Sequence, residues 1–394
     1  MIISQKRLCI AALSTIFSLF LLYSFLSLRF RSTEILNSPD SEYLYNIPYP
    51  VIRSSSSENW IASENIAIII VLAEGLERDF YRIAIDSVEC YARAHGYQFI
   101  LTHDNNWGCD HLKDKFFRRH CVVSKILPKF EAVLFLDADI GVVNPNRKLQ
   151  EYMDPQFDII FYNRHFSAEI ATGSYLVKNT PYSIQLLKEF SEYERKLPQD
   201  SFHGTDNGAI HLFLAEKLFP HNLIDLELCR RAWMNSRNVI DLLGYSSCVR
   251  TMFGASSDFG KVRILQKGTG YVRDGWLTNG IFSPERDFML HGWKMNQLAT
   301  LPPGRLLPVP KFVDKWYNPF HGEFDMQKCG LGNTTWNLNQ KFLATRANIE
   351  YSLRQYEMRS AIQKLEFLGA LHYLVKNNRI RKHLGPTDAS LFDF

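Results

Sequence analysis

Residues 132–139, Ala-Val-Leu-Phe-Leu-Asp-Ala-Asp, decide the fold. The five apolar residues have the length and composition of a strand that is buried on both faces of a sheet. Asp137 and Asp139 follow this strand directly. Ligands of open α/β sheets bind beyond the carboxyl ends of the strands, so the pair is expected at the edge of the sheet where a ligand would lie.

Strands and helices alternate on both sides of this stretch. Apolar, β-branched runs predict further strands over residues 66–72, 97–102, 158–162, 262–266 and 288–290. Helical spacing predicts helices over residues 79–95, 112–127 and 205–217, and another that opens at Thr180-Pro181. This alternation predicts an α/β fold with a mostly parallel sheet flanked by helices.

The N-terminal residues differ from the rest of the chain. Residues 8–28 form an uncharged apolar run between basic flanks, long enough to span a hydrocarbon core as a helix. We expect an uncleaved signal anchor, with residues 1–7 as a cytoplasmic tail and residues 29–64, which contain Pro and Ser clusters, as a stem. The protein is then a single-pass type II protein of the Golgi or another secretory-pathway membrane, with its folded part in the lumen. A long cleaved signal is the alternative.

The remaining residues divide into two parts. Residues 65–299 carry the alternating pattern and are expected to form the main domain. Residues 300–394 are expected to form a C-terminal extension, because the pattern changes there and apolar residues from Met358 to Val375 have helical spacing. Their helix is predicted to pack on the domain or on a partner.

Composition excludes one class of partner and supports a lumenal location. The 394 residues carry a net charge of only +4, with Lys and Arg dispersed among carboxylates, so no nucleic-acid partner is expected. One of the seven cysteines lies in the apolar run, which leaves six, an even number that suits disulfides. Short separations favour Cys109 with Cys121 and Cys229 with Cys248, although the sequence leaves the pairing open. Asn333-Thr334-Thr335 is a glycosylation sequon.

Three residues at two predicted strand ends point to a metal ion. The carboxylates of Asp137 and Asp139 suit Mn²⁺ or Mg²⁺. His291 follows the apolar residues 288–290, so it also lies at a strand end, and its imidazole would complete the coordination. Lys294 would reach a phosphate, and Gly292 would let the backbone come close to it. A solvated aspartate pair beside a loop histidine is the alternative.

Asp206 and Asn207 stand at the start of the predicted helix over residues 205–217. Thr205 or Asp206 is expected to cap this helix. Capping is compatible with ligand binding, because an exposed side chain at a helix start can face a ligand. The carboxylate of Asp206 would then accept hydrogen bonds from sugar hydroxyls or stabilise positive charge that develops at an anomeric carbon.

The order of these motifs resembles that of retaining GT-A glycosyltransferases. The residues that carry the resemblance are Phe135-Leu136-Asp137-Ala138-Asp139, Asp206-Asn207-Gly208-Ala209 and His291-Gly292-Trp293-Lys294. The chain is similar to the fungal and plant galactosyl-, mannosyl- and xylosyltransferase group, and more similar to the nematode-rich family called domain of unknown function 273. The resemblance covers residues 65–296, and it implies a GT-A fold, Rossmann-like, for the main domain.

The resemblance also implies roles for single residues. Asp137, Asp139 and His291 would bind manganese, and Lys294 would meet the diphosphate. Asp206 and Asn207 would face the donor sugar in the catalytic region. The segment Val71-Leu72-Ala73 would line the base pocket, with Lys125 approaching the phosphates. The chain departs from its relatives in having Asn207 where many have Gln, and in a shorter His–Lys spacing.

The expected function follows from these roles. The protein would be a metal-dependent hexosyltransferase that uses a UDP- or GDP-sugar as donor and a hydroxyl of a glycan or glycoprotein as acceptor, with retention implied by the resemblance alone. A non-catalytic nucleotide-sugar or glycan-binding module of the same fold is the first alternative. A scaffold protein acting through its C-terminal helix is the second. A glycosidase needs two carboxylates that flank a sugar, and Asp137 and Asp139 are too close in sequence for that.

Overall fold

The computed structural model describes residues 44–50, 60–300, 315–322 and 324–376. The chain splits into two compact units, Met1–Ile47 and Pro48–Phe394. Only residues 44–47 of the first unit are described, and they form a short helical turn. The predicted anchor over residues 8–28 and the cytoplasmic tail lie outside the described residues. Within the described part, no helix is long and apolar enough to cross a membrane.

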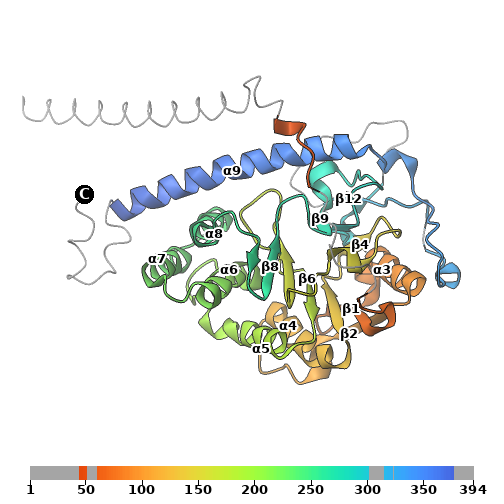
Figure 1. Ribbon diagram of the computed structural model, residues 1–394, viewed down its shortest axis with the longest axis horizontal. Coiled ribbons are helices and arrows are strands. Elements are labelled where there is room, and N and C mark those ends of the chain that lie inside the picture. The colour runs from red at the N-terminus through yellow and green to blue at the C-terminus, as the bar shows by residue number, and fades with distance from the viewer. Residues whose placement is uncertain (1–43, 51–59, 301–314, 323, 377–394) are drawn as a thin grey trace, which may run out of the picture. The chain divides into compact units, whose positions relative to one another are not determined.

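A mixed sheet of seven strands lies at the centre of the second unit (Figure 1). Its spatial order is β2 (Gln98–His103), β1 (Ile66–Leu72), β3 (Ala132–Leu136), β6 (Ser174–Lys178), β5 (Ile159–Tyr162), β8 (Val262–Leu265) and β7 (Asp258–Phe259). Strands β2, β1, β3, β5 and β8 run in one direction, whereas β6 and β7 run in the other. The prediction of an α/β fold with a mainly parallel sheet is therefore confirmed.

The predicted strands agree with those of the structure where the apolar runs are continuous. Strands β1 and β3 have the predicted bounds, and every residue of β3 is buried. Alternate residues of β1 face opposite sides of the sheet: Ile68 packs in one core cluster and Ile69 in the other. Strand β6 was not predicted, and it separates β3 from β5 by antiparallel pairing to both.

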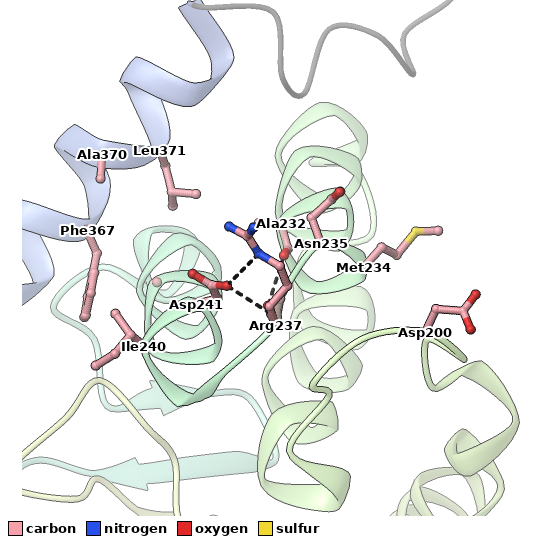
Figure 2. A pocket seen from close by; sticks show the side chains of 12 residues that line it. Asp200, Ala232, Met234, Asn235, Arg237, Ile240, Asp241, Phe367, Ala370 and Leu371 are labelled. Carbon is pink, nitrogen blue, oxygen red and sulfur yellow. Dashed lines mark hydrogen bonds and ion pairs between the residues drawn. The ribbon is translucent and has the colours of Figure 1, made fainter.

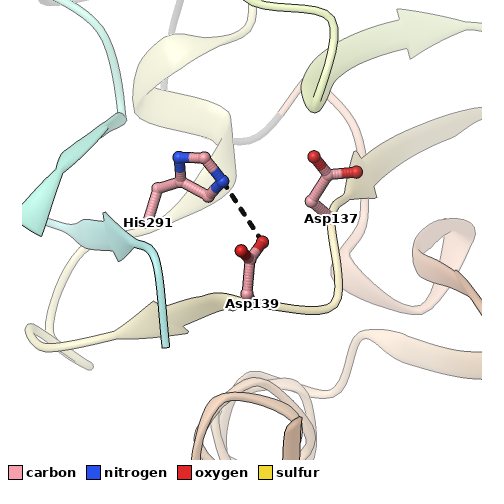
Figure 3. Close-up of side chains that lie close together, drawn as sticks. All are labelled: Asp137, Asp139 and His291. Atoms are coloured by element: carbon pink, nitrogen blue, oxygen red, sulfur yellow. Dashed lines mark ion pairs between the residues drawn. The ribbon is translucent and has the colours of Figure 1, made fainter. Parts of the chain in front are cut away.

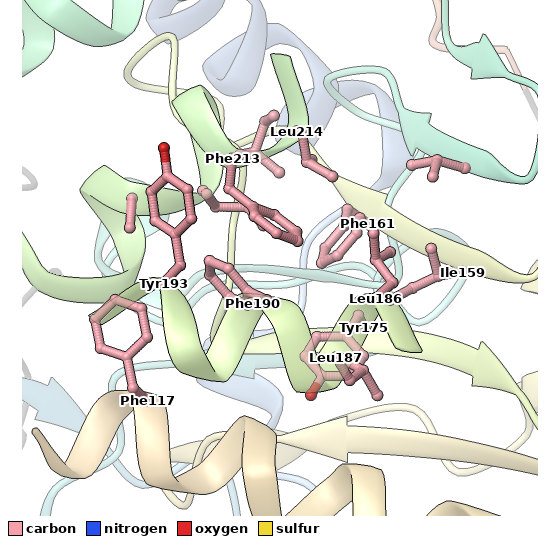
Figure 4. Packing of buried hydrophobic residues seen from close by; sticks show 14 of the residues in the cluster. Phe117, Ile159, Phe161, Tyr175, Leu186, Leu187, Phe190, Tyr193, Phe213 and Leu214 are labelled. Carbon is pink, nitrogen blue, oxygen red and sulfur yellow. The ribbon is translucent and has the colours of Figure 1, made fainter. Parts of the chain in front are cut away.

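Helices cover both faces of the sheet. Helix α3 packs on one face, and α4, α5, α6, α7 and α8 contribute to the core on the other face, where large aromatic side chains meet (Figure 4). The bounds of these helices are α3 (Arg82–His95), α4 (Lys115–Ile126), α5 (Pro181–Glu192), α6 (Thr205–Leu218), α7 (Leu223–Met234) and α8 (Val239–Phe253).

The helix expected to open at Thr180 is confirmed, whereas the cap expected for the helix over residues 205–217 is wrong. Gly96 ends α3 with a φ of 76°, and the side chain of Thr180 accepts the backbone N–H of Ser183 at the start of α5. Helix α6 has Gly204 at its N-cap position and no side-chain cap, so neither Thr205 nor Asp206 is the cap. The carboxylate of Asp206 is instead engaged by side chains from α4.

A second sheet of three strands brings the later part of the chain to the end of β3. Its order is β4 (Ile140–Val142), β10 (Met289–His291) and β9 (Val272–Asp274). Strand β10 pairs antiparallel with β4 and parallel with β9, so His291 lies between Ile140 and Asp274. Because β4 begins one residue after Asp139, this sheet carries β10 directly to the aspartate pair.

The C-terminal helix α9 (Arg346–Lys376) is longer than the predicted pattern over residues 358–375. Its N-terminal half packs through Ile349 and Leu353, which are buried with Tyr49 and Leu277. The phenol of Tyr49 also donates to Glu357 of this helix (2.8 Å). The C-terminal helix therefore packs on the domain, which is one of the two arrangements predicted from the sequence.

Three disulfides link the six cysteines that remain when Cys9 is set aside. The predicted pairs Cys109–Cys121 and Cys229–Cys248 are confirmed. The third pair, Cys90–Cys329, joins α3 to the segment before α9 across a sequence separation of 239 residues.

Candidate functional site

The aspartate pair is held by backbone hydrogen bonds from two directions. The N–H of Asp137 donates to the carbonyl of Gly173 at the edge of β6 (2.7 Å). The carbonyl of Asp139 accepts the N–H groups of Gly292 and Trp293 (both 2.9 Å). The turn after β10 is therefore attached to the aspartate pair, although more than 150 residues separate them in sequence.

Asp137, Asp139 and His291 form a group that could hold a metal ion (Figure 3). One ligand atom from each residue lies within 4.8 Å of the others. His291 Nε2 is 3.2 Å from Asp139 Oδ1, and the ammonium of Lys294 is 3.6 Å from Asp139 Oδ2. Two carboxylates and one imidazole are a donor set that Mn²⁺ accepts, so the residues fit the predicted ion.

The charges in this group shift one another's pKa values. Burial raises the pKa of Asp137 to about 6, although the positive charge of Arg119 lowers it; the negative charge of Asp139 raises it further. Burial would also raise the pKa of Asp139, but His291 and Lys294 outweigh it and lower that pKa to about 2. Burial would lower the pKa of His291, yet Asp139 and Asp274 raise it to about 10. Metal binding therefore requires His291 to lose its Nε2 proton.

Asp274 and Arg164 extend the group on the side of His291 that faces away from Asp139. His291 Nδ1 lies 3.0 Å from Asp274 Oδ1, and Arg164 Nη2 donates to the same oxygen (2.5 Å). Burial would raise the pKa of Asp274, but Arg164 and His291 hold it below its usual range. Neither residue was among the site residues predicted from the sequence. The residues of β9 are too few to show a strand pattern, so no local signal placed Asp274 beside His291.

Arg119 connects the metal group to the start of α6. Its guanidinium contacts Asp137 through Nη1 and donates to Asp206 through Nη2 (2.5 Å). Arg119 was not among the site residues predicted from the sequence. The sequence did carry a signal for Arg119. It lies in the first turns of the helix that follows β2, and these turns lie at the carboxyl edge of a parallel sheet, where ligands bind.

The two residues predicted to face the donor sugar occupy different positions. Asp206 is fully buried, and its carboxylate contacts Arg119 and His120. Burial disfavours its charged form, but Arg119 and His120 outweigh that effect and lower its pKa. Asn207 lines a small pocket beside Asp137 and accepts the hydroxyl of Thr172 (2.8 Å).

This pocket has a volume of about 40 Å³ and opens between the ends of the two sheets. Its polar lining consists of Asp137, Tyr162, Arg164, Asn207, Asp274 and His291. Gly173 forms part of the wall, where a Cβ atom would lie 2.3 Å from Asp137 Oδ2. The pocket thus brings the predicted metal ligands and Asn207 together with positively charged Arg164.

The residues predicted to bind the base and phosphates differ in burial and in the contacts they make. Leu72 is buried in the core, whereas Val71 and Ala73 at the carboxyl end of β1 are partly exposed. The ammonium of Lys125 donates to the carbonyls of Trp107 and Gly108 (2.7 and 3.0 Å). Gly292 has a φ of 113°, a backbone conformation that favours glycine, at the turn between His291 and Lys294.

A larger hollow of about 620 Å³ lies elsewhere, between α7, α8 and α9 (Figure 2). Its charged lining residues are Asp200, Arg237 and Asp241, and the last two form an ion pair. Among the described residues, the group of potential metal ligands is at Asp137, Asp139 and His291 instead. We therefore place the candidate site at the smaller pocket, because it combines potential metal ligands with groups whose pKa values are shifted.

The chain matches the family described as Protein of unknown function, DUF273, over residues 88–308. The match spans more than half of the 394 residues, so the chain belongs to this family, as its motifs predicted. No curated protein matches the sequence.

The structure is similar to two glycosyltransferases of known structure. One is involved in the glycosylation of the major capsid of PBCV-1; the match has 22% identity, covers 35% of this chain and 69% of that chain, and has a TM-score of 0.29. The other is GlyE of Streptococcus pneumoniae TIGR4 in its apo form. This match has 15% identity, covers 38% of this chain and 43% of that chain, and has a TM-score of 0.28. The chain spans less than two thirds of this GlyE structure.

Proposed function

We propose that the protein is a metal-dependent glycosyltransferase. It transfers a hexose from a nucleotide-diphosphate sugar to a hydroxyl group of a glycan or glycoprotein, with retention of anomeric configuration. The observation that carries this proposal is the group formed by Asp137, Asp139 and His291 at the carboxyl edge of the main sheet, with Lys294 beside it. Donor and acceptor are inferred from the motifs and from this chemistry, and retention is inferred from the family resemblance alone.

Asp137, Asp139 and His291 would hold Mn²⁺ or Mg²⁺, which neutralises negative charge on a departing diphosphate. Lys294 is the cation best placed to add to this effect, because its side chain is 41% exposed and lies beside Asp139. A point charge of this kind stabilises the leaving group without a proton transfer. The ammonium would turn from Asp139 toward the diphosphate when a donor binds.

Asn207 and Arg164 would contact the donor or acceptor sugar, since both line the pocket beside Asp137. In this proposal Asp206 does not contact the sugar itself, because its carboxylate is fully buried and paired with Arg119. Arg119 in turn contacts Asp137, so Asp206 fixes the position of a metal ligand as well as the start of α6. A retaining reaction needs no strong external base if a donor phosphate oxygen accepts the proton of the acceptor hydroxyl.

We also propose that the protein is a type II protein of the Golgi or another secretory-pathway membrane, anchored by residues 8–28. Three disulfides support a lumenal location, because disulfides persist in oxidising compartments. The sequon at Asn333 supports it too, since the side chain of Asn333 is partly exposed.

The experiment measures release of nucleoside diphosphate by the purified protein from a panel of UDP- and GDP-sugars, with Mn²⁺ or with a chelator. The test variant carries Asp137→Asn and Asp139→Asn. A matched control carries Asp154→Asn and Asp258→Asn, which remove the same charge from the two partners of Arg263. We expect metal-dependent release from one donor in the wild-type protein and the control, and loss of at least 100-fold in the test variant.

Two other results would change the conclusion. Metal-dependent thermal stabilisation by a nucleotide, without release in the presence of any acceptor tried, would favour the non-catalytic binding module. Absence of both release and stabilisation would leave Asp137 and Asp139 as a structural strand end, and the proposal would be wrong.

A further inference from the structure

We propose that Asp274 is a positioning residue that fixes the imidazole ring of His291 for metal binding, and that Arg164 fixes Asp274 in turn. This inference rests on the proposed metal site. Neither Asp274 nor Arg164 belongs to the Asp137-Ala138-Asp139 segment or to the His291-Gly292-Trp293-Lys294 segment, from which the metal site was predicted.

The backbone brings Asp274 to His291. The two residues are directly paired in the parallel ladder between β9 and β10, and both end their strands. Neighbouring strands lie about 4.8 Å apart, so side chains of paired residues on one face are in contact range. The observed separation between His291 Nδ1 and Asp274 Oδ1 is 3.0 Å.

This hydrogen bond decides which ring nitrogen is available to an ion. Asp274 is an acceptor, so Nδ1 of His291 must carry the proton that it donates. Nε2 then points to Asp139, at 3.2 Å, on the side where the other predicted ligands lie. A histidine that donates its other N–H to a carboxylate has its tautomer and ring orientation fixed for ligation.

Asp274 is itself held from the opposite side. Arg164 donates to both of its carboxylate oxygens, through Nη2 (2.5 Å) and Nε (3.3 Å). Asp274 is buried, so this contact is protected from solvent screening. With one oxygen shared between Arg164 and His291, the carboxylate has little freedom to rotate.

The segment that carries Arg164 is tied to the C-terminal helix. The N–H of Arg164 donates to the carbonyl of Glu169 (3.0 Å) and closes a short loop. The ammonium of Lys267 donates to two carbonyls of this loop, those of His165 and Ser167 (2.9 and 2.7 Å), and to the hydroxyl of Ser360 in α9 (2.6 Å). A continuous set of contacts therefore runs from α9 to the predicted metal ligand.

The test compares two buried aspartates of the same region. Asp274→Asn keeps the side-chain volume and removes the charge that fixes His291. The matched control is Asp287→Asn, because Asp287 is also buried and also paired with arginine, here Arg273 and Arg286, and no described contact joins it to His291. Binding of Mn²⁺ is measured by titration calorimetry, with the metal alone and in the presence of UDP or GDP, together with the thermal midpoint of each protein.

We expect both variants to lose thermal stability, because each removes a buried carboxylate charge that pairs with an arginine, Arg164 or Arg273. Only Asp274→Asn is expected to weaken Mn²⁺ binding, by about 10- to 100-fold. Equal Mn²⁺ affinities in Asp274→Asn and the wild-type protein would overturn the positioning role while leaving the proposed function intact. A wild-type protein that binds no Mn²⁺ in any of these conditions would overturn both.

A second measurement needs no change at Asp274 and covers the case in which that variant does not fold. Spectra of ¹⁵N-histidine-labelled wild-type protein are recorded with Mg²⁺ and UDP or GDP, and the His291 signals are assigned by their loss in His291→Gln. We expect the tautomer with the proton on Nδ1. A proton on Nε2 in the presence of the metal would contradict the positioning role.

Discussion

Gly173 shows how closely the site depends on single residues. A Cβ at this position would lie 2.3 Å from Asp137 Oδ2, so no other residue fits without moving the carboxylate. We predict that Gly173→Ala lowers metal-dependent activity by about 100-fold, because displacements of about 1 Å at a reacting group have effects of this size. Titration with Mn²⁺ and measurement of donor turnover test this predicted loss.

The control for this substitution is Gly330→Ala, since a Cβ at position 330 would meet nothing within 4 Å. That variant should retain wild-type metal affinity. If Gly173→Ala bound Mn²⁺ as tightly as the control, Asp137 would not be a metal ligand in its observed position.

The pKa of Lys267 predicts how the free energy of unfolding depends on pH. Burial lowers the pKa of Lys267 to about 7 from its ordinary value of 10.5. Between these two values the unfolded chain binds the proton and the folded protein does not, so the free energy of unfolding should rise with pH. The slope from this residue is at most about 1.4 kcal/mol per pH unit.

Lys267→Met should remove that slope, because methionine does not titrate. The measurement is the free energy of unfolding in denaturant at pH 7, 8 and 9 for both proteins. Parallel curves for the wild-type protein and the variant would show that Lys267 keeps an ordinary pKa in the fold.

At the scale of elements, helix α9 behaves as part of the folded unit. Leu353 is 0% exposed on its inner face, whereas Leu365 is 70% exposed further along the same helix. We predict that Leu353→Ala destabilises the protein by about 2–5 kcal/mol, the usual range for emptying a leucine site in a core. Denaturant unfolding of the purified protein measures this change.

Leu365→Ala is the matched substitution on the same helix, and it should change stability by about 0.5 kcal/mol or less. Similar losses in the two variants would mean that the exposed half of α9 is buried in solution, for example against a second molecule. No loss in Leu353→Ala would contradict the packing of α9 on the domain.

At the scale of the whole molecule, the Cys90–Cys329 disulfide closes a loop far longer than the other two. Its separation is 239 residues, against 19 for Cys229–Cys248. If disulfides stabilise mainly by restricting the unfolded chain, the gain grows with the logarithm of loop length. For these two lengths the difference is about 2 kcal/mol in favour of the longer loop.

We therefore predict that replacing Cys90 and Cys329 with Ala lowers the free energy of unfolding by about 2 kcal/mol more than replacing Cys229 and Cys248. Unfolding of both double variants in urea provides the comparison. A greater loss from the shorter loop would show that local packing, rather than chain entropy, sets the contribution of these disulfides.

The sequence by itself determined the features that depend on local patterns. Continuous apolar runs defined β1 and β3 to the residue, because strands buried on both faces need such runs. The position of Asp137 and Asp139 at the end of a buried strand followed from the same pattern. The short separation of Cys109 and Cys121 favoured their pairing, which the structure confirms, although the sequence alone left the choice of partner open.

Only the tertiary structure decided which distant residues meet at the site. The insertion of β6 between β3 and β5 put Gly173 against Asp137, and the pairing of β9 with β10 put Asp274 against His291. Strand order and pairing depend on contacts between segments many residues apart, which no local pattern encodes. Contacts between distant segments also decided the different positions of two neighbouring residues. Asp206 is buried and paired with Arg119, whereas Asn207 lines the pocket.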